Sequence, residues 1–492
     1  MSREELLKQL DRPASDPWDL VVIGGGAVGI GTALDAVSRG YSCVLFEQHD
    51  FCKGTSSRST KLIHGGVRYL AQGNVSLVRE ALHERGLLLQ NAPTMVRPLR
   101  FIVPCYSSLE RWYYWAGMKC YDALAGNLGI ESSRQLKTAQ VAESIPGLRQ
   151  DGVRGGVAYF DAQFDDARLV ISVARKVREL GGVPLNYMRV SGLLKNADRI
   201  AGVTVQDVET SQEYQIHAKA VVNAAGTFSD DVRKMEMSTA PEMISPSQGI
   251  HLVVHQKFLG GRDAIMIPKT KDGRVLFAIP WLGRVVLGTT DTPVTHASLE
   301  PRPQEQEIEY LIQHFAEYLD PAPRRDDVLS LFAGLRPLVK PKHEAGSTAK
   351  ISREHRIIQS QGGLISILGG KWTTFRKMAE DVVDVVADVG GLPQRPTATL
   401  QLQLEAGVGS DPSSPEAAPT REQVVRCVRH EFARTVEDVL ARRFRSLLLD
   451  ARRSVTFADD VAAVLTEELG HDSRWCEQQI GEFSDLARQY TV

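Results

Sequence analysis

The stretch KLIHGGVRYL, residues 61–70, combines cations with a pair of glycines. A glycine pair lets the main chain lie close to a bound group, and neighbouring cations hold an anion. The residues concerned are Lys61, His64, Gly65, Gly66, Arg68 and Tyr69. Together they predict a site for an anionic cofactor, an anionic substrate or both.

The elements upstream of this stretch predict what the site holds. Residues 17–50 follow the order strand, glycine-rich turn, helix, strand and acid. Glycines in such a turn let a pyrophosphate approach the helix N-terminus, and an acid at the end of the second strand accepts hydrogen bonds from ribose hydroxyls. The positions are Gly24, Gly26, Gly29 and Glu47, with apolar runs at 20–23 and 43–46. The segment therefore predicts a dinucleotide-binding βαβ unit.

A polar loop after the acid favours FAD over NAD, because an NAD domain normally continues into further βαβ units. Hydroxyls in this loop can bond phosphate or ribityl oxygens. A helix N-terminus with a lysine, later in the chain, would stabilise the anionic reduced flavin. The further predicted contacts are Thr55, Ser56, Ser57, Lys61, His64, Gly65, Gly66, Val190, Gly226, Gly370, Lys371, Trp372 and Thr373. Strand–glycine elements so far apart predict FAD in a discontinuous domain.

Eight motifs in a fixed order resemble those of the FAD-dependent glycerol-3-phosphate dehydrogenase family, of the quinone-linked, aerobic type. The resemblance is strongest over residues 17–385 and continues through the C-terminal segment. The motifs are GGGAVGIGTALDAVSRG, TSSRSTKLIHGGVRYL, DDARLV, VVNAAG, LGTTDTP, GLRPL, ISREHRI and GGKWTTFRKMAE.

The resemblance implies an α/β fold (α+β overall). Its parts are an FAD-binding domain of the glutathione-reductase and D-amino-acid-oxidase type, a β-sheet substrate cap and a helical C-terminal domain. Short or alternating apolar runs in the middle of the chain agree with an antiparallel cap. The expected boundaries are 17–86, 150–235 and 335–392 for the FAD domain, 87–149 and 236–334 for the cap, 393–420 for a linker, and 421–492 for the helical domain.

The activity that the resemblance implies is oxidation of sn-glycerol 3-phosphate to dihydroxyacetone phosphate, with hydride passing from C2 to N5 of a non-covalently bound FAD. A phosphate dianion needs cations, preferably arginines that grip it with two hydrogen bonds. Motif matching assigns this role to Arg68, Arg336 and Arg353. Tyr69 and Thr290 are expected to bond the remaining oxygens.

Loss of the hydroxyl proton requires a base. His251, on a predicted cap strand, is the first candidate, and His64 is the alternative. Lys371 and Arg336 can stabilise the alkoxide without taking the proton. These expectations make His251, Arg336 and Lys371 the catalytic residues. A histidine packed in the core, outside the chemistry, is the other interpretation of His251.

The composition limits the classes of ligand and partner that the chain is expected to bind. The net charge of −2 at pH 7 gives no global field for a nucleic acid. Six scattered cysteines without metal-ligand spacing predict reduced thiols and no metal site. The N-terminus lacks the apolar core of a signal peptide, and no run of 18 uncharged apolar residues predicts a membrane span.

Two segments bear on membrane association. Residues 109–126 are dense in aromatics beside cations, which suits either a membrane interface or a helix packed into the cap. A basic cluster can meet anionic lipid or pair with acids; it comprises Arg442, Arg443, Arg445, Arg452 and Arg453. The resemblance implies a membrane quinone as acceptor and a cytoplasmic enzyme attached peripherally to the inner face of the cell membrane. A homodimer is also considered.

Alternative functions stay open at this point. A glycerol-3-phosphate oxidase would share every motif, although such relatives often carry an added cap segment, and none is evident here. An amine or amino-acid oxidase of this fold would need a carboxylate-binding arginine but no cluster for a dianion. A flavin-binding redox sensor without turnover would not need Arg68, Arg336, Arg353 and Lys371 together.

Overall fold

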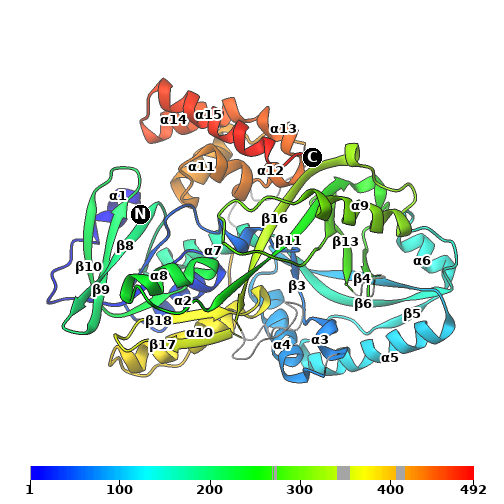
Figure 1. The fold of residues 1–492 in the computed structure, drawn as a ribbon, viewed down its shortest axis with the longest axis horizontal. Coiled ribbons are helices and arrows are strands. Elements are labelled where there is room, and N and C mark those ends of the chain that lie inside the picture. Colours follow the sequence, from blue (N-terminus) through cyan, green and yellow to red (C-terminus); the bar gives the residue numbers. More distant parts are fainter. Residues whose placement is uncertain (1, 72, 269, 271–273, 341–354, 406–415) are drawn as a thin grey trace.

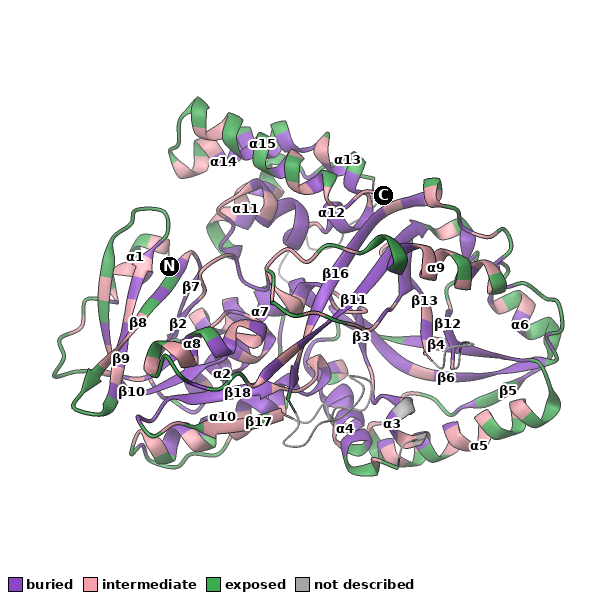
Figure 2. Cartoon of the chain, in the orientation of Figure 1, coloured by how far each residue is buried: buried purple, intermediate pink, exposed green. Residues whose placement is uncertain are grey.

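The computed structural model describes residues 2–492, except residues 72, 269, 271–273, 341–354 and 406–415. Two large sheets lie side by side, and the C-terminal helices cover the region where they meet (Figure 1). The interiors of both sheets are buried, and most exposed residues lie on the outer helices and loops (Figure 2). This is the FAD domain, cap and helical domain expected from the sequence.

The first sheet has the strand order β17–β18–β10–β1–β2–β7, and β8 and β9 continue from β10. The strands from β18 to β7 are parallel neighbours. Helix α2 follows β1, and α10 follows β18. The bounds are β1 Trp18–Ile23, α2 Ala27–Ser38, β2 Cys43–Phe46, α7 Asp166–Glu179, β7 Val183–Leu185, β8 Met188–Asn196, β9 Arg199–Asp207, β10 Glu213–Asn223, α8 Ser229–Glu236, β17 His355–Gln359, β18 Ile365–Gly369 and α10 Phe375–Val389.

Local sequence explains most of these elements. The apolar β2 is buried along its length, as a parallel strand covered on both faces must be. Helix α7 begins at a capping acid, because the Asp165 side chain accepts a hydrogen bond from the Arg168 N–H at 3.1 Å. The chain turns at Tyr187, whose φ is +56°, and forms β7 and β8 on either side.

The second sheet forms the cap, with the strand order β15–β11–β14–β13–β12–β4–β6–β3. Strand β16 pairs with β11, and β5 pairs with β6. The bounds are β3 Leu62–Ile63, β4 Val96–Cys105, β5 Arg134–Leu136, β6 Gly155–Phe164, β11 Ile244–His255, β12 Ala264–Ile267, β13 Leu276–Trp281, β14 Arg284–Gly288, β15 Thr292–Pro293 and β16 Val328–Val339. The domain boundaries expected at 150 and 335 do not coincide with the limits of this sheet, because β6 and the end of β16 belong to the sheet by hydrogen bonding.

Helices flank the cap sheet. Their bounds are α3 Val67–Ala71, α4 Val75–Asn91, α5 Ser108–Ala125, α6 Thr138–Ser144 and α9 Glu305–Tyr318. The side chains of α9 that face the sheet, Ile308, Leu311 and Phe315, are buried in a cluster with apolar residues of β11, β12 and β14. This packing fixes α9 against the part of the cap that carries the candidate substrate residues.

The C-terminal domain is helical, as expected, and starts after a segment that is only partly a linker. Its elements are α11 Arg421–Glu431, the π-helix η9 Asp438–Arg443, α12 Ser446–Leu449, α13 Ala451–Val455, α14 Ala458–Leu469 and α15 Ser473–Arg488. Within the expected linker, Thr397 donates a hydrogen bond to Asp35 at 2.5 Å and Leu404 N donates to Asn91 O at 2.7 Å. The chain from 393 to 405 therefore packs on α2 of the FAD domain and on the end of α4.

The basic cluster of the C-terminal domain divides into two groups. Arg442, Arg443 and Arg445 are buried and pair with acids, so they face no lipid. Arg452 and Arg453 are exposed. In the described part of the chain, no helix combines the length and the apolar character that crossing a bilayer demands.

Candidate cofactor and substrate site

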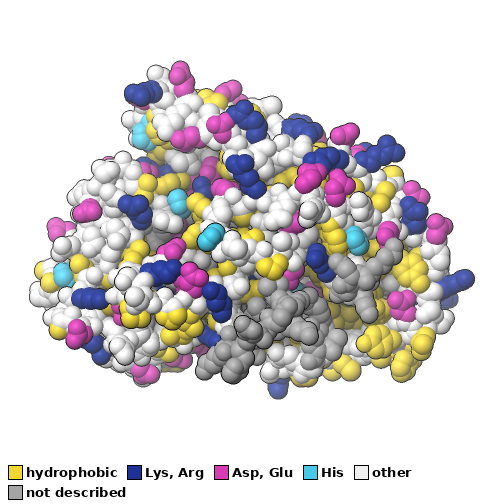
Figure 3. Space-filling model, viewed as in Figure 1, with side chains coloured by type: hydrophobic (Ala, Val, Ile, Leu, Met, Phe, Trp, Pro, Cys, Tyr) yellow, Lys and Arg dark blue, Asp and Glu magenta, His cyan; other side chains and the backbone are white. Residues whose placement is uncertain are grey.

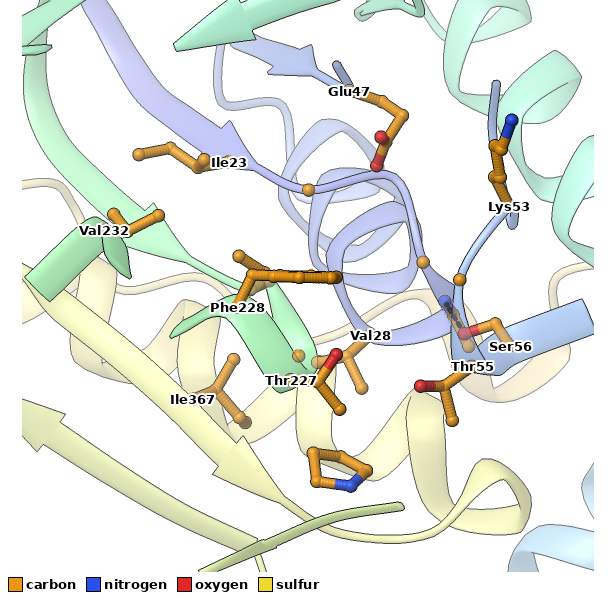
Figure 4. A pocket seen from close by; sticks show the side chains of 18 of the residues that line it. Ile23, Val28, Glu47, Lys53, Thr55, Ser56, Thr227, Phe228, Val232 and Ile367 are labelled. Carbon is orange, nitrogen blue, oxygen red and sulfur yellow. Dashed lines mark hydrogen bonds between the residues drawn. The ribbon is translucent and has the colours of Figure 1, made fainter. Parts of the chain in front are cut away.

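A cavity of about 290 Å³ lies where the turns after β1, β2, β10 and β18 meet (Figure 4). The sequence predicts the cofactor at these glycine-rich turns and at the polar loop after β2. The predicted contacts that line the cavity are Gly24, Gly26, Glu47, Thr55, Ser56, Val190, Gly226, Gly370, Lys371 and Trp372. Segments distant in the sequence thus meet at one site, because the parallel sheet aligns the carboxyl ends of its strands.

The start of α2 fits a bound pyrophosphate. Gly26 is its N-cap, without a side-chain cap, and no acid lies in the first turn. Ser56 Oγ accepts a hydrogen bond from Ala27 N at 3.0 Å, and the first turn of a helix carries N–H groups and a partial positive charge that attract anions. Gly24 has a φ of +107°, and a Cβ added at Gly29 would overlap the Gly24 carbonyl oxygen. Only glycines allow this turn, and the result is an anion cradle.

The acid that follows β2 faces the same cavity. Glu47 Oε2 accepts a hydrogen bond from Gly25 N at 2.7 Å, and Oε1 accepts one from His49 N at 2.9 Å. Burial raises the pKa of Glu47 above its usual value, although these N–H groups act against the rise. A carboxyl group fixed in this way can accept hydrogen bonds from ribose hydroxyls. The donors and open space of the cavity therefore fit the adenosine and pyrophosphate parts of FAD.

Several residues predicted to contact the cofactor lie behind the cavity wall. Thr373 Oγ1 accepts a hydrogen bond from His64 N at 3.2 Å and donates one to His64 O at 3.3 Å. Gly65 N donates to Tyr121 Oη at 2.8 Å. These contacts tie the loop to η7, Trp372–Thr374, and to α5. The predicted contacts outside the cavity lining are Gly29, Ser57, Lys61, His64, Gly65, Gly66 and Thr373.

Lys61, which was predicted to contact the cofactor, is engaged in a buried salt bridge. Its ammonium group is fully buried, donates to Asp166 Oδ2 at 2.7 Å and donates to Ser57 O at 2.6 Å. Burial lowers the pKa of Lys61 to about 8, while Asp166 acts to raise it. A buried cation needs such a partner. Lys61 is therefore a structural member of a salt-bridge network beside the site.

Sequence reasoning missed other lining residues. Val28 lies in the first turn of α2, and Lys53 lies in the polar loop. Thr227 and Phe228 follow Gly226 directly, and both point into the cavity (Figure 4). Their positions next to predicted glycines were the available signal. The cavity-facing side of Phe228 adds an apolar surface that could contact a flat ring.

On the cap side, Arg336 is held by the loop that joins β14 and β15. Its guanidinium donates to Thr290 O at 3.1 Å and to Thr289 Oγ1 at 3.3 Å, and it lies 3.5 Å from Asp291 Oδ1. A Cβ at Gly249 would overlap this guanidinium, so glycine gives it room. Arg336 is only half-buried. A cation fixed in this way can meet an anion with little loss of side-chain entropy.

His251 lies on the same face of the cap sheet as Arg336. The pairs His251–Phe332 and Ser247–Arg336 of β11 and β16 have the even spacing that directs side chains to one face. The imidazole stacks on Phe332, with ring centroids 4.8 Å apart, and its Nε2 lies 3.0 Å from Thr60 Oγ1. Nδ1 has no hydrogen-bond partner among the described residues. Burial, followed by the charges of Lys61 and Arg336, holds the pKa of His251 well below its usual value.

The side chain of Thr290, which was predicted to bind substrate, is engaged inside the cap. Thr290 is fully buried, and its hydroxyl donates to Glu307 Oε1 at 2.7 Å and accepts from Ile250 N at 3.1 Å. The hydroxyl proton and one of the two lone pairs are therefore used inside the protein. The neighbouring Thr289 is half-buried, and its hydroxyl is the one that contacts Arg336.

The remaining predicted residues come from the FAD domain or are not described. The ammonium of Lys371 lies 4.1 Å from the ring centroid of Tyr69, and Lys371 lines the cofactor cavity. Arg68 is in α3, but its side chain lies outside the described part of the structure, and Arg353 lies outside the described residues altogether. Lys371 and Tyr69 thus face each other at the edge of the cofactor cavity.

Comparisons with known proteins follow the division into domains. Residues 19–376 match the family described as FAD dependent oxidoreductase, and residues 394–476 match the C-terminal domain of alpha-glycerophosphate oxidase. A mitochondrial glycerol-3-phosphate dehydrogenase of Arabidopsis thaliana is 41% identical over 486 residues, which cover 95% of this chain and 76% of that protein. The human mitochondrial glycerol-3-phosphate dehydrogenase is 42% identical over 84% of this chain, which spans 58% of the human protein.

Comparison with solved structures agrees with these sequence matches. The glycerol-3-phosphate dehydrogenase from Bacillus halodurans complexed with FAD superimposes with a TM-score of 0.79 and 28% identity, covering 99% of this chain and 97% of its own. An L-alpha-glycerophosphate oxidase from Mycoplasma pneumoniae has a TM-score of 0.60 at 16% identity, covers 78% of this chain and 96% of its own, and shares the fold.

Proposed function

The chain belongs to the FAD-dependent glycerol-3-phosphate dehydrogenase family, and we propose that it oxidises sn-glycerol 3-phosphate to dihydroxyacetone phosphate and passes the electrons to a quinone. The observation that carries this proposal is the pairing of a fixed cation, Arg336, with a neutral imidazole, His251, on one face of the cap sheet. A phosphate dianion needs the first, and a hydroxyl that loses its proton needs the second.

The chain's own residues supply binding and proton chemistry. Bound non-covalently in the cavity, FAD supplies the acceptor for the hydride that leaves C2 of the substrate. Gly26, Glu47 and Ser56 would hold its adenosine and pyrophosphate parts, and Lys371 would lie near the other end. Arg336 orients the substrate through its phosphate, because remote binding energy is what places the reacting carbon.

Proton removal is assigned to His251. A neutral imidazole accepts a proton at the ring nitrogen that carries the lone pair, and Nδ1 of His251 is buried without a hydrogen-bond partner among the described residues. Arg336 and Lys371 can stabilise the negative charge that develops on the C2 oxygen. This assignment agrees with the depressed pKa of His251, which leaves the ring unprotonated at neutral pH.

The substrate and acceptor are tested by flavin absorbance without oxygen. We expect sn-glycerol 3-phosphate to bleach the bound flavin rapidly, and a short-chain quinone to restore the colour faster than air does. Fast recovery in air would instead identify an oxidase. A flavin that no polyol phosphate bleaches would overturn the substrate and revive the redox sensor.

Peripheral attachment to the inner face of the cell membrane, in the cytoplasm, is part of the proposal. Helix α5 exposes Leu109, Trp112 and Tyr113, whose exposed fractions are 79%, 60% and 65%. Hydrophobic side chains gather in this region of the surface, at the lower right of Figure 3. Exposed apolar groups of this kind mark interaction sites, and Trp and Tyr favour the headgroup level of a membrane. A quinone dissolved in the bilayer would then be within reach of the protein.

Sedimentation with lipid vesicles tests this attachment. Replacing Trp112 and Tyr113 with serine should release the protein from vesicles that contain anionic lipid. Met237→Ser is the matched control, because Met237 is 53% exposed on another part of the chain. Equal loss of binding in both proteins, or none in either, would remove α5 as the membrane-facing element.

A further inference from the structure

A short stretch of the C-terminal domain, residues 442–445, contacts both ends of the segment that forms one wall of the FAD cavity. Residues 52–56 all line that cavity. They lie between Asp50 and Ser57, and each of these two positions receives a buried arginine from residues 442–445. The C-terminal domain therefore contacts the cofactor site through the loop after β2, although it is distant from that loop in the sequence.

The first contact is centred on Asp50. Its carboxylate accepts hydrogen bonds from Arg442 and Arg443, including one from Arg443 to Oδ1 at 2.9 Å, and another from Asn186 Nδ2 at 3.2 Å. Both Asp50 and Arg443 side chains are 0% exposed. Burial alone would raise the pKa of Asp50, but Arg443 and Arg442 outweigh it and leave the pKa below its usual value. Asp50 is thus an ionised, fully paired anchor at neutral pH.

The second contact is centred on the main chain of Ser57. Arg445 donates to Ser57 O at 2.9 Å and to Asp166 Oδ1 at 2.7 Å, and Lys61 donates to the same two residues. Ser57 follows Ser56, whose hydroxyl accepts from the first N–H of α2. Arg445 therefore sets the position of a hydroxyl that lies at the predicted pyrophosphate cradle.

A third contact reaches the middle of the wall. Lys53 lines the cavity, and its ammonium lies 2.7 Å from Glu437 Oε2. Glu437 in turn receives Arg442 at 2.6 Å. Both side chains of the Lys53–Glu437 pair are partly exposed, at 17% and 19%. The pair can therefore be changed with less structural damage than the buried ones.

We propose that Arg443 and Arg445 are positioning residues of the FAD site, so that docking of the C-terminal domain and binding of FAD strengthen each other. Coupling between two sites is reciprocal: a domain that fixes the loop for FAD is itself held more tightly once FAD fixes the loop. Removing one partner of a buried pair leaves the other charge uncompensated, so the loop cannot keep its position. This inference concerns FAD binding and does not depend on the substrate.

The same interface offers a matched control. Arg168 of α7 pairs with Glu431 of the C-terminal domain at 2.7 Å, and both side chains are nearly buried. Neither residue lines the FAD cavity. Glu431→Gln therefore breaks a buried ion pair between the same two domains, but it keeps the Glu431 main-chain carbonyl that accepts hydrogen bonds from Arg443.

The test measures FAD affinity in the full chain, after FAD has been removed and titrated back. Asp50→Asn should raise the Kd for FAD by roughly tenfold, within the usual range of coupling between sites. Glu437→Gln should raise it by a smaller factor, and Glu431→Gln should leave it unchanged while lowering the unfolding temperature. Equal shifts in Asp50→Asn and Glu431→Gln would overturn the proposal, since a general loss of domain packing would then explain both.

Hydrogen exchange in the unaltered protein gives a second test that does not depend on any variant folding. Addition of FAD should slow amide exchange in residues 50–57 and in residues 438–446 together, while α14 and α15 keep their rates. Slower exchange in residues 50–57 alone would overturn the coupling, whatever the variants show.

Discussion

Two adjacent threonines on the cap separate a structural role from a role in substrate binding. Thr289 and Thr290 can each be replaced by valine, which keeps the shape and removes the hydroxyl. The Thr290 hydroxyl is buried between Glu307 and Ile250 N, whereas the Thr289 hydroxyl accepts a hydrogen bond from Arg336. The two substitutions are chemically identical, so any difference between the two variants in stability or KM reflects where each hydroxyl lies.

The structure sets the expected magnitudes. Thr290→Val leaves Ile250 N without its acceptor and removes a charge-assisted bond to Glu307, which together should cost about 3 kcal/mol of unfolding free energy. Glu307 still accepts hydrogen bonds from Thr292 at 2.7 Å and from Gln248 at 2.7 Å, so its carboxylate stays hydrogen-bonded. Thr289→Val removes one of the contacts that orient Arg336 and should cost less than ~1 kcal/mol of stability.

The assays are thermal unfolding and steady-state kinetics with sn-glycerol 3-phosphate. Thr290→Val should unfold at a clearly lower temperature with a nearly normal KM for the folded enzyme. Thr289→Val should unfold almost normally with a KM raised about fivefold, which corresponds to about 1 kcal/mol of lost binding. A Thr290→Val enzyme of normal stability and high KM would refute the reasoning and restore Thr290 as a substrate contact.

Three further predictions concern charged groups. Arg336→Ala should lower kcat/KM by about 100-fold and raise KM, because the phosphate anchor also orients C2; an unchanged KM would remove Arg336 from the site. Lys371→Ala should slow flavin reduction or weaken FAD retention in stopped-flow and titration experiments, and Lys371→Arg should restore part of the loss by keeping the charge. Burial first, and then Lys53, lower the pKa of His49 to about 4 from its usual 6.5. The unfolded chain then binds the proton first as pH falls, so stability is complete above 6.5 and decreases between 6.5 and 4; His49→Gln should flatten this part of the curve of unfolding temperature against pH.

The cofactor half of the site could be predicted because its signals are local. The turn after β1 needs glycines at fixed spacing, and the acid follows within the same βαβ unit, so short-range turn chemistry determines their geometry. Gly24, Gly26 and Glu47 all line the cavity as a result. Thr227 and Phe228 come directly after Gly226, so a prediction extended past Gly226 would have included these two cavity residues.

The substrate half depends on pairing across the cap sheet, which one sequence cannot fix. Whether Thr289 or Thr290 faces Arg336 is decided by the register of β11 with β14 and β16. Lys61 looked like an anion-binding cation because its partner Asp166, and the Arg445 that shares this carboxylate, come from other parts of the chain. The basic run near the C-terminus was ambiguous for the same reason, since only the fold brings Asp50 to it.

The pKa of His251 should depend on whether substrate is bound. Burial holds its pKa well below the usual value, and Lys61 and Arg336 add to this effect. A bound phosphate dianion would offset the charge of Arg336, so the pKa of His251 should rise when substrate binds, and the imidazole becomes a stronger base in the complex than in the free enzyme. The pH profile of kcat should then show an acid limb that His251→Gln abolishes, with stability and FAD content unchanged. An acid limb that survives in His251→Gln would assign the proton to another group and leave His251 as a packed core histidine.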